Sequence, residues 1–160
     1  MSTELEIPEN IKNHPAWHRL QNQHDWYSKE SSKNKKKYHH FKITQFILAA
    51  LIPVITLIDF SSTKYIVALF GATIAVIEGI QQLFQYHTLW FDYRSTSEHL
   101  KHEQFLFLSL SGPYRDLSYE KGLLLLAERI EEHISKEHAK WVDTSKKLSL
   151  EIAKQIEKSV

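Results

Sequence analysis

The middle of the chain holds two apolar stretches, ITQFILAALIPVITLIDF at residues 43–60 and YIVALFGATIAVIEGIQQLFQY at residues 65–86. The first carries only Thr44, Gln45, Thr56 and Asp59 as polar side chains. A helix of this length reaches about 27 Å, which is close to the thickness of a lipid hydrocarbon core. Because only residues 61–64 separate the stretches, we predict an antiparallel helical hairpin.

Two interpretations of this hairpin are open. It can be the buried centre of a soluble helical protein, or it can cross a membrane. A core helix in a chain of 160 residues normally keeps a polar face, whereas both stretches are apolar nearly all round. We therefore favour transmembrane helices at residues 43–60 and 65–86, with residues 61–64 as the external loop.

The distribution of lysines predicts the orientation of the hairpin. The segment before the first stretch carries Lys33, Lys35, Lys36, Lys37 and Lys42, whereas the loop carries only Lys64. Basic residues are retained on the cytoplasmic side of a membrane. Both termini are thus predicted to be cytoplasmic, in the bacterial inner (cell) membrane, with the lipid bilayer as a partner.

The flanking regions are predicted to be helical as well. Residues 1–12 are interpreted as a mobile tail, residues 13–42 as a cytoplasmic helix with a basic shoulder, and residues 87–160 as a cytoplasmic helical region. A low content of glycine and proline, four of each, argues against a fold with many turns. The predicted class is all-α: a transmembrane hairpin continuous with long cytoplasmic helices packed as a bundle.

The C-terminal region is predicted to hold two helical segments after a stop at residues 111–114, where Gly112 suits the left-handed position at a helix C-terminus. The first segment runs from about Tyr119 to Trp141, with an apolar face at Leu123, Leu126, Ile130, Ile134 and Trp141. The second follows it, with Leu148, Ile152 and Ile156 at steps of four.

Several classes of function are disfavoured by composition. The net charge is +1, so the chain as a whole lacks the basic footprint of a nucleic-acid binder, and no nucleic acid is expected as partner. The absence of cysteine removes thiolate zinc sites and cysteine nucleophiles. Ten histidines include His14/His18 and His99/His102 at helical spacing, but no established metal motif surrounds them. We expect no metal, no cofactor and no catalytic residues.

A polar stripe in the second apolar stretch is the first candidate site. On a helical projection Glu78, Gln82 and Gln85 share a face with small residues, and Gly71, Ala75 and Gly79 form a series that allows another helix to approach closely. The first stretch offers a weaker polar face at Gln45 and Thr56. These polar groups either fix the packing within one hairpin or line a water-accessible path between several hairpins. A third interpretation places Glu78 at the level of the lipid headgroups.

Short motifs along the chain, one of them inside the second apolar stretch, resemble in order and spacing the bacterial SLATT-type two-transmembrane effector superfamily, in its domain-of-unknown-function family 4231 branch. They occur as Gln23 to Tyr27, Glu78-Gly79, Trp90 to Arg94, Leu100 to Glu103, Gly112 to Tyr114, Glu128-Arg129 and Glu137 to Trp141. The motif positions taken as candidate sites are Gln23, Trp26, Tyr27, Trp90, Tyr93, Arg94, Glu103, Gly112, Pro113, Tyr114, Glu128, Arg129, Glu137 and Trp141.

The resemblance implies a pore-forming or membrane-perturbing effector of nucleotide-signalled conflict and defence systems. It also implies a partner protein that generates or senses a nucleotide. From the residues themselves we expect Arg94 and Arg129 to pair with Glu103, Glu128 or Glu137 in an ion-pair network, or to form a small-ligand pocket. The three functional hypotheses are an oligomeric pore-forming effector, a non-enzymatic membrane scaffold that oligomerises or recruits a partner, and a soluble binding protein with a buried hairpin.

Overall fold

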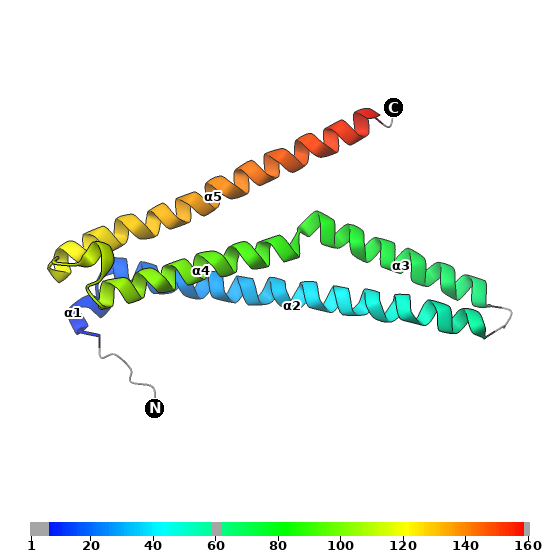
Figure 1. The fold of residues 1–160 in the computed structure, drawn as a ribbon, viewed down its shortest axis with the longest axis horizontal. Coiled ribbons are helices and arrows are strands. Elements are labelled where there is room, and N and C mark those ends of the chain that lie inside the picture. The colour runs from blue at the N-terminus through cyan, green and yellow to red at the C-terminus, as the bar shows by residue number, and fades with distance from the viewer. Residues whose placement is uncertain (1–6, 59–61, 159–160) are drawn as a thin grey trace. The chain divides into compact units, whose positions relative to one another are not determined.

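The fold consists of helices joined by short turns. The computed structural model describes residues 7–58 and 62–158, without the side chains of residues 137, 138, 140, 141, 144, 145, 147, 148 and 151–158. Its elements are α1 (Glu9–Lys12), α2 (Pro15–Leu57), α3 (Thr63–Phe84), α4 (Tyr86–Leu108), the 3-10 turn η1 (Gly112–Tyr114) and α5 (Tyr119–Lys158) (Figure 1). These described residues contain no strand, and the predicted all-α class is confirmed.

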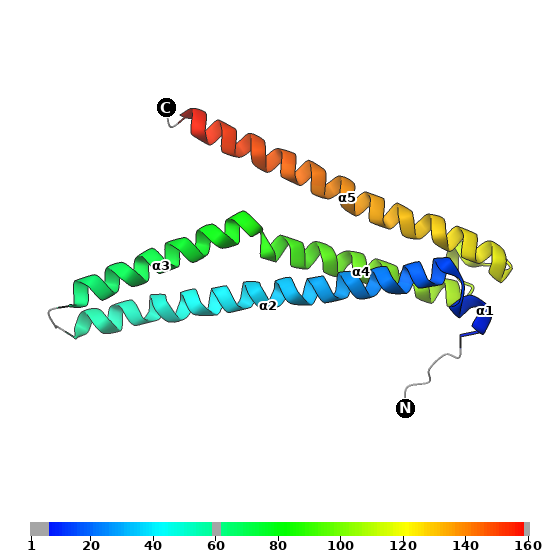
Figure 2. The same ribbon diagram turned by 180° about the vertical axis from the view of Figure 1, so that it is seen from behind.

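Two compact units make up the chain. The hairpin unit covers Ser28–Arg94, and the terminal unit combines Met1–Tyr27 with Ser95–Val160. In the hairpin unit α3 runs alongside the C-terminal part of α2, as Figures 1 and 2 both show. Residues 43–57 are the end of the long helix α2, so the predicted continuity of the first apolar stretch with the preceding helix is confirmed. Asp59 of the predicted loop region lies outside the described residues.

The second apolar stretch ends two residues earlier than predicted. Its helix α3 stops at Phe84 because Gln85 adopts a left-handed backbone conformation with φ of 47°. A new helix begins at Tyr86, so α3 and α4 are separate helices where one continuous helix was expected. The Gln85 N–H still donates to the Gln81 carbonyl at 2.9 Å, so the break costs the chain no hydrogen bond at this position.

The core of the terminal unit forms around the predicted apolar face of α5. Leu123, Leu126, Ile130 and Ile134 are all buried, which confirms these four positions of the face. The fifth, Trp141, has a side chain outside the described part of the structure. The four buried residues lie in a core with large side chains from three other elements, namely Trp17 and Leu20 of α2, Leu100 and Phe107 of α4, and Tyr114 of η1. The Trp17 and Phe107 rings are 6.1 Å apart, and the Phe107 and Tyr114 rings are 5.6 Å apart.

The connection between α4 and α5 is tight. Helix α4 ends in a Schellman arrangement, in which the Ser111 N–H donates to the Leu106 carbonyl at 3.0 Å and the Leu110 N–H to the Phe107 carbonyl at 3.2 Å. The left-handed residue of this cap is Leu110, with φ of 46°; Gly112, predicted to hold that position, also has positive φ (59°) but belongs to η1. Gly122 allows α5 to approach α4, since a Cβ there would lie 3.1 Å from the Phe107 ring.

Two expectations about the chain ends need correction. Residues 9–12 of the predicted mobile tail form α1, and Ile11 within it is fully buried, because an apolar side chain there completes the core of the terminal unit. The C-terminal region was expected to hold two helical segments, one to Trp141 and a further one beyond it. It forms the single helix α5, because no glycine or proline interrupts residues 123–158.

Replacing Leu126 tests the core of the terminal unit. Leu126→Ala removes a fully buried side chain, so we expect the free energy of unfolding to fall by about 2–5 kcal/mol. The matched control is Leu124→Ala on the same helix, where the side chain is 66% exposed and the change should stay within about 0.5 kcal/mol. Urea unfolding of the purified chain, followed by circular dichroism, measures both. Equal effects of the two substitutions would contradict the described core.

Candidate functional site

A line of polar side chains joins α2 to α3 within the otherwise apolar hairpin. The Lys42 ammonium donates to Glu78 Oε2 at 2.9 Å, and the Gln45 amide donates to the same oxygen at 3.0 Å. Gln45 also donates to the Ile74 carbonyl at 3.2 Å, and Gln81 donates to Gln45 Oε1 at 2.8 Å. We call Lys42, Gln45, Glu78 and Gln81 the polar seam.

The polar seam differs from the predicted polar stripe in its members. Gln81 and Gln45 are both buried, with 7% of their surface exposed. Gln82 is exposed. The glutamine of α3 that extends the seam is Gln81, which sequence reasoning left out of the stripe and which is linked to Glu78 through Gln45. Lys42 was counted only as part of the basic shoulder. The spacing of Glu78 and Gln81, one helical turn apart, was the available signal for their common direction.

The small residues of α3 lie away from the seam. Gly71, Ala75 and Gly79 are exposed, and a Cβ built at either glycine would meet nothing within 4 Å. Their predicted role in helix packing therefore has no partner helix within the described residues. Of the other predicted polar positions, Thr56 is exposed and donates to the Pro53 carbonyl at 2.8 Å, and Gln85 is the residue between α3 and α4.

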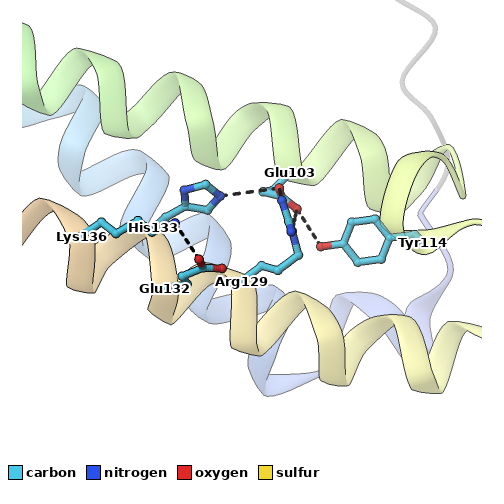
Figure 3. A network of polar contacts seen from close by, with 6 residues as sticks. All are labelled: Glu103, Tyr114, Arg129, Glu132, His133 and Lys136. Carbon is cyan, nitrogen blue, oxygen red and sulfur yellow. Dashed lines mark hydrogen bonds and ion pairs between the residues drawn. The ribbon is translucent and has the colours of Figure 1, made fainter.

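A second polar cluster lies in the terminal unit around Glu103, whose side chain is 2% exposed (Figure 3). Arg129 of α5 binds both carboxylate oxygens, with its Nε 2.8 Å from Oε2. The Tyr114 hydroxyl donates to Oε2 at 2.8 Å, and His133 Nε2 lies 3.6 Å from Oε1. The predicted pairing of Arg129 with Glu103 is confirmed by these contacts, and the family-motif residues Glu103, Tyr114 and Arg129 form one network.

The electrostatics of the network keep Glu103 charged. Burial alone would raise the pKa of Glu103, but the hydrogen bonds from Arg129 and Tyr114 and the Arg129 charge together outweigh burial and hold that pKa below its usual value. Burial and the Glu103 carboxylate raise the pKa of the Tyr114 hydroxyl. The network is hence a buried, hydrogen-bonded ion pair that ties α4, η1 and α5 together.

The remaining motif residues lie outside the Glu103 network, in several different environments. Tyr27 is buried, and its ring meets that of Trp26 edge-on at 4.8 Å, although Trp26 itself is 49% exposed. Trp90 lies among aromatic and histidine rings of the hairpin unit. Glu128 and Arg94 are exposed, Gln23 and Tyr93 are half-buried, and Pro113 lies exposed in η1. The side chains of Glu137 and Trp141 lie outside the described part of the structure.

The histidines whose side chains are described form no metal site. Among the described side chains, no group of three or more histidines and carboxylates could hold a metal ion. His99 stacks on His133, with ring centroids 5.6 Å apart and planes 8° from parallel. This stacking couples His99 to the Glu103 network by ring contact.

These features define a class of protein: an all-α chain with two helices long and apolar enough to cross a membrane and a separately packed helical unit. The family model described as Protein of unknown function (DUF4231) matches residues 22–121, which is more than half of the chain. The chain belongs to this family, which confirms the resemblance at the level of that branch. No curated protein and no solved structure matches the chain.

The lowered pKa of Glu103 makes the stability of the terminal unit depend on pH. The stabilisation by the charged Glu103 is complete above the pKa of glutamate in the unfolded chain, about 4.3. It is lost as the pH falls through the lower pKa that Glu103 has in the folded chain. Glu103→Gln should reduce the free energy of unfolding by about 3 kcal/mol at neutral pH. The difference between wild type and variant should shrink as the pH falls below about 4.3.

Chemical unfolding at a series of pH values measures this difference. Glu128→Gln, at an exposed position of the same helix as Arg129, removes the same charge without touching the network and is the matched control. If the wild type and Glu103→Gln keep a constant difference down to pH 3, the buried pair is not the cause.

Proposed function

We propose that this chain is an integral protein of the bacterial cell membrane, with α3 and the C-terminal part of α2 as its two spans. The supporting observation is the exposure of the apolar hairpin, since only 6% of each candidate span is buried by the chain itself. Exposed large side chains follow both helices: Ile43, Phe46, Ile47, Leu51, Val54 and Leu57 on α2, and Tyr65, Leu69, Val76 and Leu83 on α3. A soluble protein would cover such a surface, whereas lipid covers it at no cost.

The orientation follows from the lysines. Five of them, from Lys33 to Lys42, precede the first span, and the turn between the spans carries Lys64. This asymmetry supports a cytoplasmic location for both termini and an external location for the turn at Ser62.

We infer further that the protein acts as a self-associating, pore-forming or membrane-perturbing effector. The exposed face of α3 supports this function, because Gly71, Ala75 and Gly79 would let helices of neighbouring copies approach closely. Gln82 is exposed close to the same face, and the Glu78 side chain beside it is 43% exposed. Association through this face would place Gln82 and Glu78 of several copies around a shared polar path, with Gln85 at its end.

The resemblance to SLATT-type effectors supports the same proposal. It adds the expectation of a partner protein that generates or senses a nucleotide, which would supply the trigger. The family match itself carries no assigned activity, so the effector role rests on the hairpin and on the resemblance together.

A second candidate is a membrane scaffold that oligomerises without conducting ions. It is favoured by the pairing of Glu78 with Lys42 and Gln45, which gives the carboxylate a packing role inside one hairpin. The two candidates differ in one measurable property, because a scaffold forms a complex and carries no ion flux.

The topology can be tested with single cysteines, because the chain has none of its own. Ser62→Cys, in the turn between the spans, should react with a membrane-impermeant maleimide added to intact spheroplasts. Ser118→Cys, between η1 and α5, is the matched control and should react only after the membrane is opened. The wild-type chain should stay in the membrane fraction after a carbonate wash. Release by carbonate would contradict membrane insertion, and the reverse labelling pattern would contradict the orientation.

Purified protein in liposomes separates the pore from the scaffold. Wild type should carry ion flux, and induced expression should collapse the membrane potential of cells. The double variant Gly71→Leu/Gly79→Leu fills the small-residue face and should reduce the flux roughly tenfold or more. A loss of about 1.4 kcal/mol in the free energy of association between copies suffices for a tenfold change. Ala50→Leu, on an exposed position of α2, is the control and should leave the flux unchanged.

The carboxylate is tested in the same assay. Glu78→Gln should change the flux if Glu78 contributes to the path. A stable oligomer without flux, whatever residue occupies position 78, would exclude the pore and support the scaffold.

A further inference from the structure

Lysines and rings from two helices meet in the hairpin unit next to the apolar spans. We define the lysine–aromatic collar as Lys35, Lys36, Lys37, Tyr38 and His39 of α2 with Tyr86, His87 and Trp90 of α4. The Tyr38 ring lies 5.0 Å from His87 and 6.4 Å from Trp90, and His39 lies 5.7 Å from Trp90. The rings of Tyr38, His39, His87 and Trp90 thus form a contiguous cluster that spans both helices.

Two of the lysines are held against these rings. Lys35 Nζ lies 5.4 Å from the centre of the Trp90 ring, and Lys37 Nζ lies 5.3 Å from the centre of the Tyr86 ring. Contact with the face of an aromatic ring attracts an ammonium group and restricts its long side chain. Both lysines remain exposed, so their charges are positioned without being neutralised.

The charge of the collar is not balanced within the hairpin unit. Residues 33–42 contain five lysines and no acidic residue. Lys33 pairs with Glu30 at 3.3 Å and Lys42 with Glu78 at 2.9 Å. For Lys35, Lys36 and Lys37, the part of the chain that the structure describes provides no carboxylate partner. Two positioned cations, Lys35 and Lys37, and the exposed Lys36 between them therefore complement an anionic partner.

The collar also adjoins the surface that we assign to lipid tails. Tyr86 stacks on Phe41 at 5.9 Å and on Phe84 at 5.5 Å, and the exposed side chains of Ile43, Phe46 and Ile47 follow directly on α2. The left-handed Gln85 separates α3 from α4 at this level. Tyrosine and tryptophan rings above an apolar band are typical of the membrane interface, where lipid phosphates lie.

We propose that the lysine–aromatic collar binds the phosphate groups of anionic phospholipids and selects them over zwitterionic ones. The proposal rests on the membrane insertion proposed above and names the lipid class that the protein requires. Lys35 and Lys37 supply positioned charge, Lys36 adds a third cation, and the Trp90 and Tyr86 rings hold the geometry. The apolar side chains next to the collar favour a lipid over a nucleic acid as the ligand. Exposed Phe46 and Ile47 can contact the acyl chains of a lipid, and a nucleic acid has no acyl chains to offer them.

Lipid titration of the full-length chain in detergent tests the proposal. Native mass spectrometry gives the dissociation constants of phosphatidylglycerol and phosphatidylcholine. Wild type should bind phosphatidylglycerol at least tenfold more tightly. The triple variant Lys35→Gln/Lys36→Gln/Lys37→Gln should lose this preference. Each lysine removed should weaken the affinity for phosphatidylglycerol by about fivefold. Trp90→Leu, which keeps the charge, should weaken the preference by a few fold.

Matched controls separate position from charge. Lys12→Gln/Lys101→Gln/Lys121→Gln removes three exposed lysines of the terminal unit and should leave the preference unchanged. Replacing the three collar lysines with arginine keeps their charge and should retain it. The preference of wild type should also fall with added salt, because the cations are exposed.

Several outcomes would overturn the proposal. They are equal binding of the two lipids by wild type, an equal loss in both triple variants, displacement of the lipid by inorganic phosphate at equal concentration, or tighter binding of single-stranded RNA. None of these affects carbonate-resistant insertion, which tests the proposed function separately. If the chain inserts into membranes but shows no lipid preference, the proposed membrane spans stand and the proposed lipid selectivity of the collar is wrong.

Discussion

The hydrogen bonds of the polar seam fix how α2 and α3 pair. Only 6% of each candidate span is buried within the chain, so side-chain packing alone specifies the register of the two helices weakly. The hydrogen bonds from Lys42 and Gln45 to Glu78 and from Gln81 to Gln45 favour the observed alignment, because a shift would leave the buried amides of Gln45 and Gln81 without these partners. The position of every other side chain in the hairpin follows from that alignment.

The terminal unit is fixed by the same kind of interaction in a different environment. Glu103 is surrounded by a packed core, and Arg129 and Tyr114 reach it from α5 and η1. A carboxylate at 2% exposure is tolerated only with such partners, so the turn that carries Tyr114 must close correctly before the core is complete. The tight connection at Leu110 and the close approach at Gly122 serve that closure.

Much of this fold could be predicted from the spacing of apolar residues along the sequence. The polar seam could be predicted only in part. Four apolar residues of α5 recur at helical spacing, and all four are buried. The partner of Glu78 could not be predicted, because Lys42 lies 36 positions away in a basic run that resembles a solvated surface. Gln81 was missed because the helical projection gives angles without the direction of the neighbouring helix. The cap at Leu110 was missed because leucine rarely adopts positive φ, whereas Gly112 nearby does so readily.

The seam also has a consequence for the surface that remains. Lys42 pairs with Glu78, so a hairpin inserted in a membrane as proposed would carry a paired charge, which costs less in lipid than a single ion. Gln45 donates to the Ile74 carbonyl and to Glu78 and accepts from Gln81, whereas Gln81 Oε1 is the one side-chain atom of the described residues that is buried without a partner. What the hairpin presents outward is apolar side chains, a strip of small residues, the amide of Gln82 and part of the Glu78 carboxylate. Because that carboxylate is paired with Lys42, a pore built on the strip would carry little net fixed charge, and its discrimination between ions would come more from width than from electrostatics.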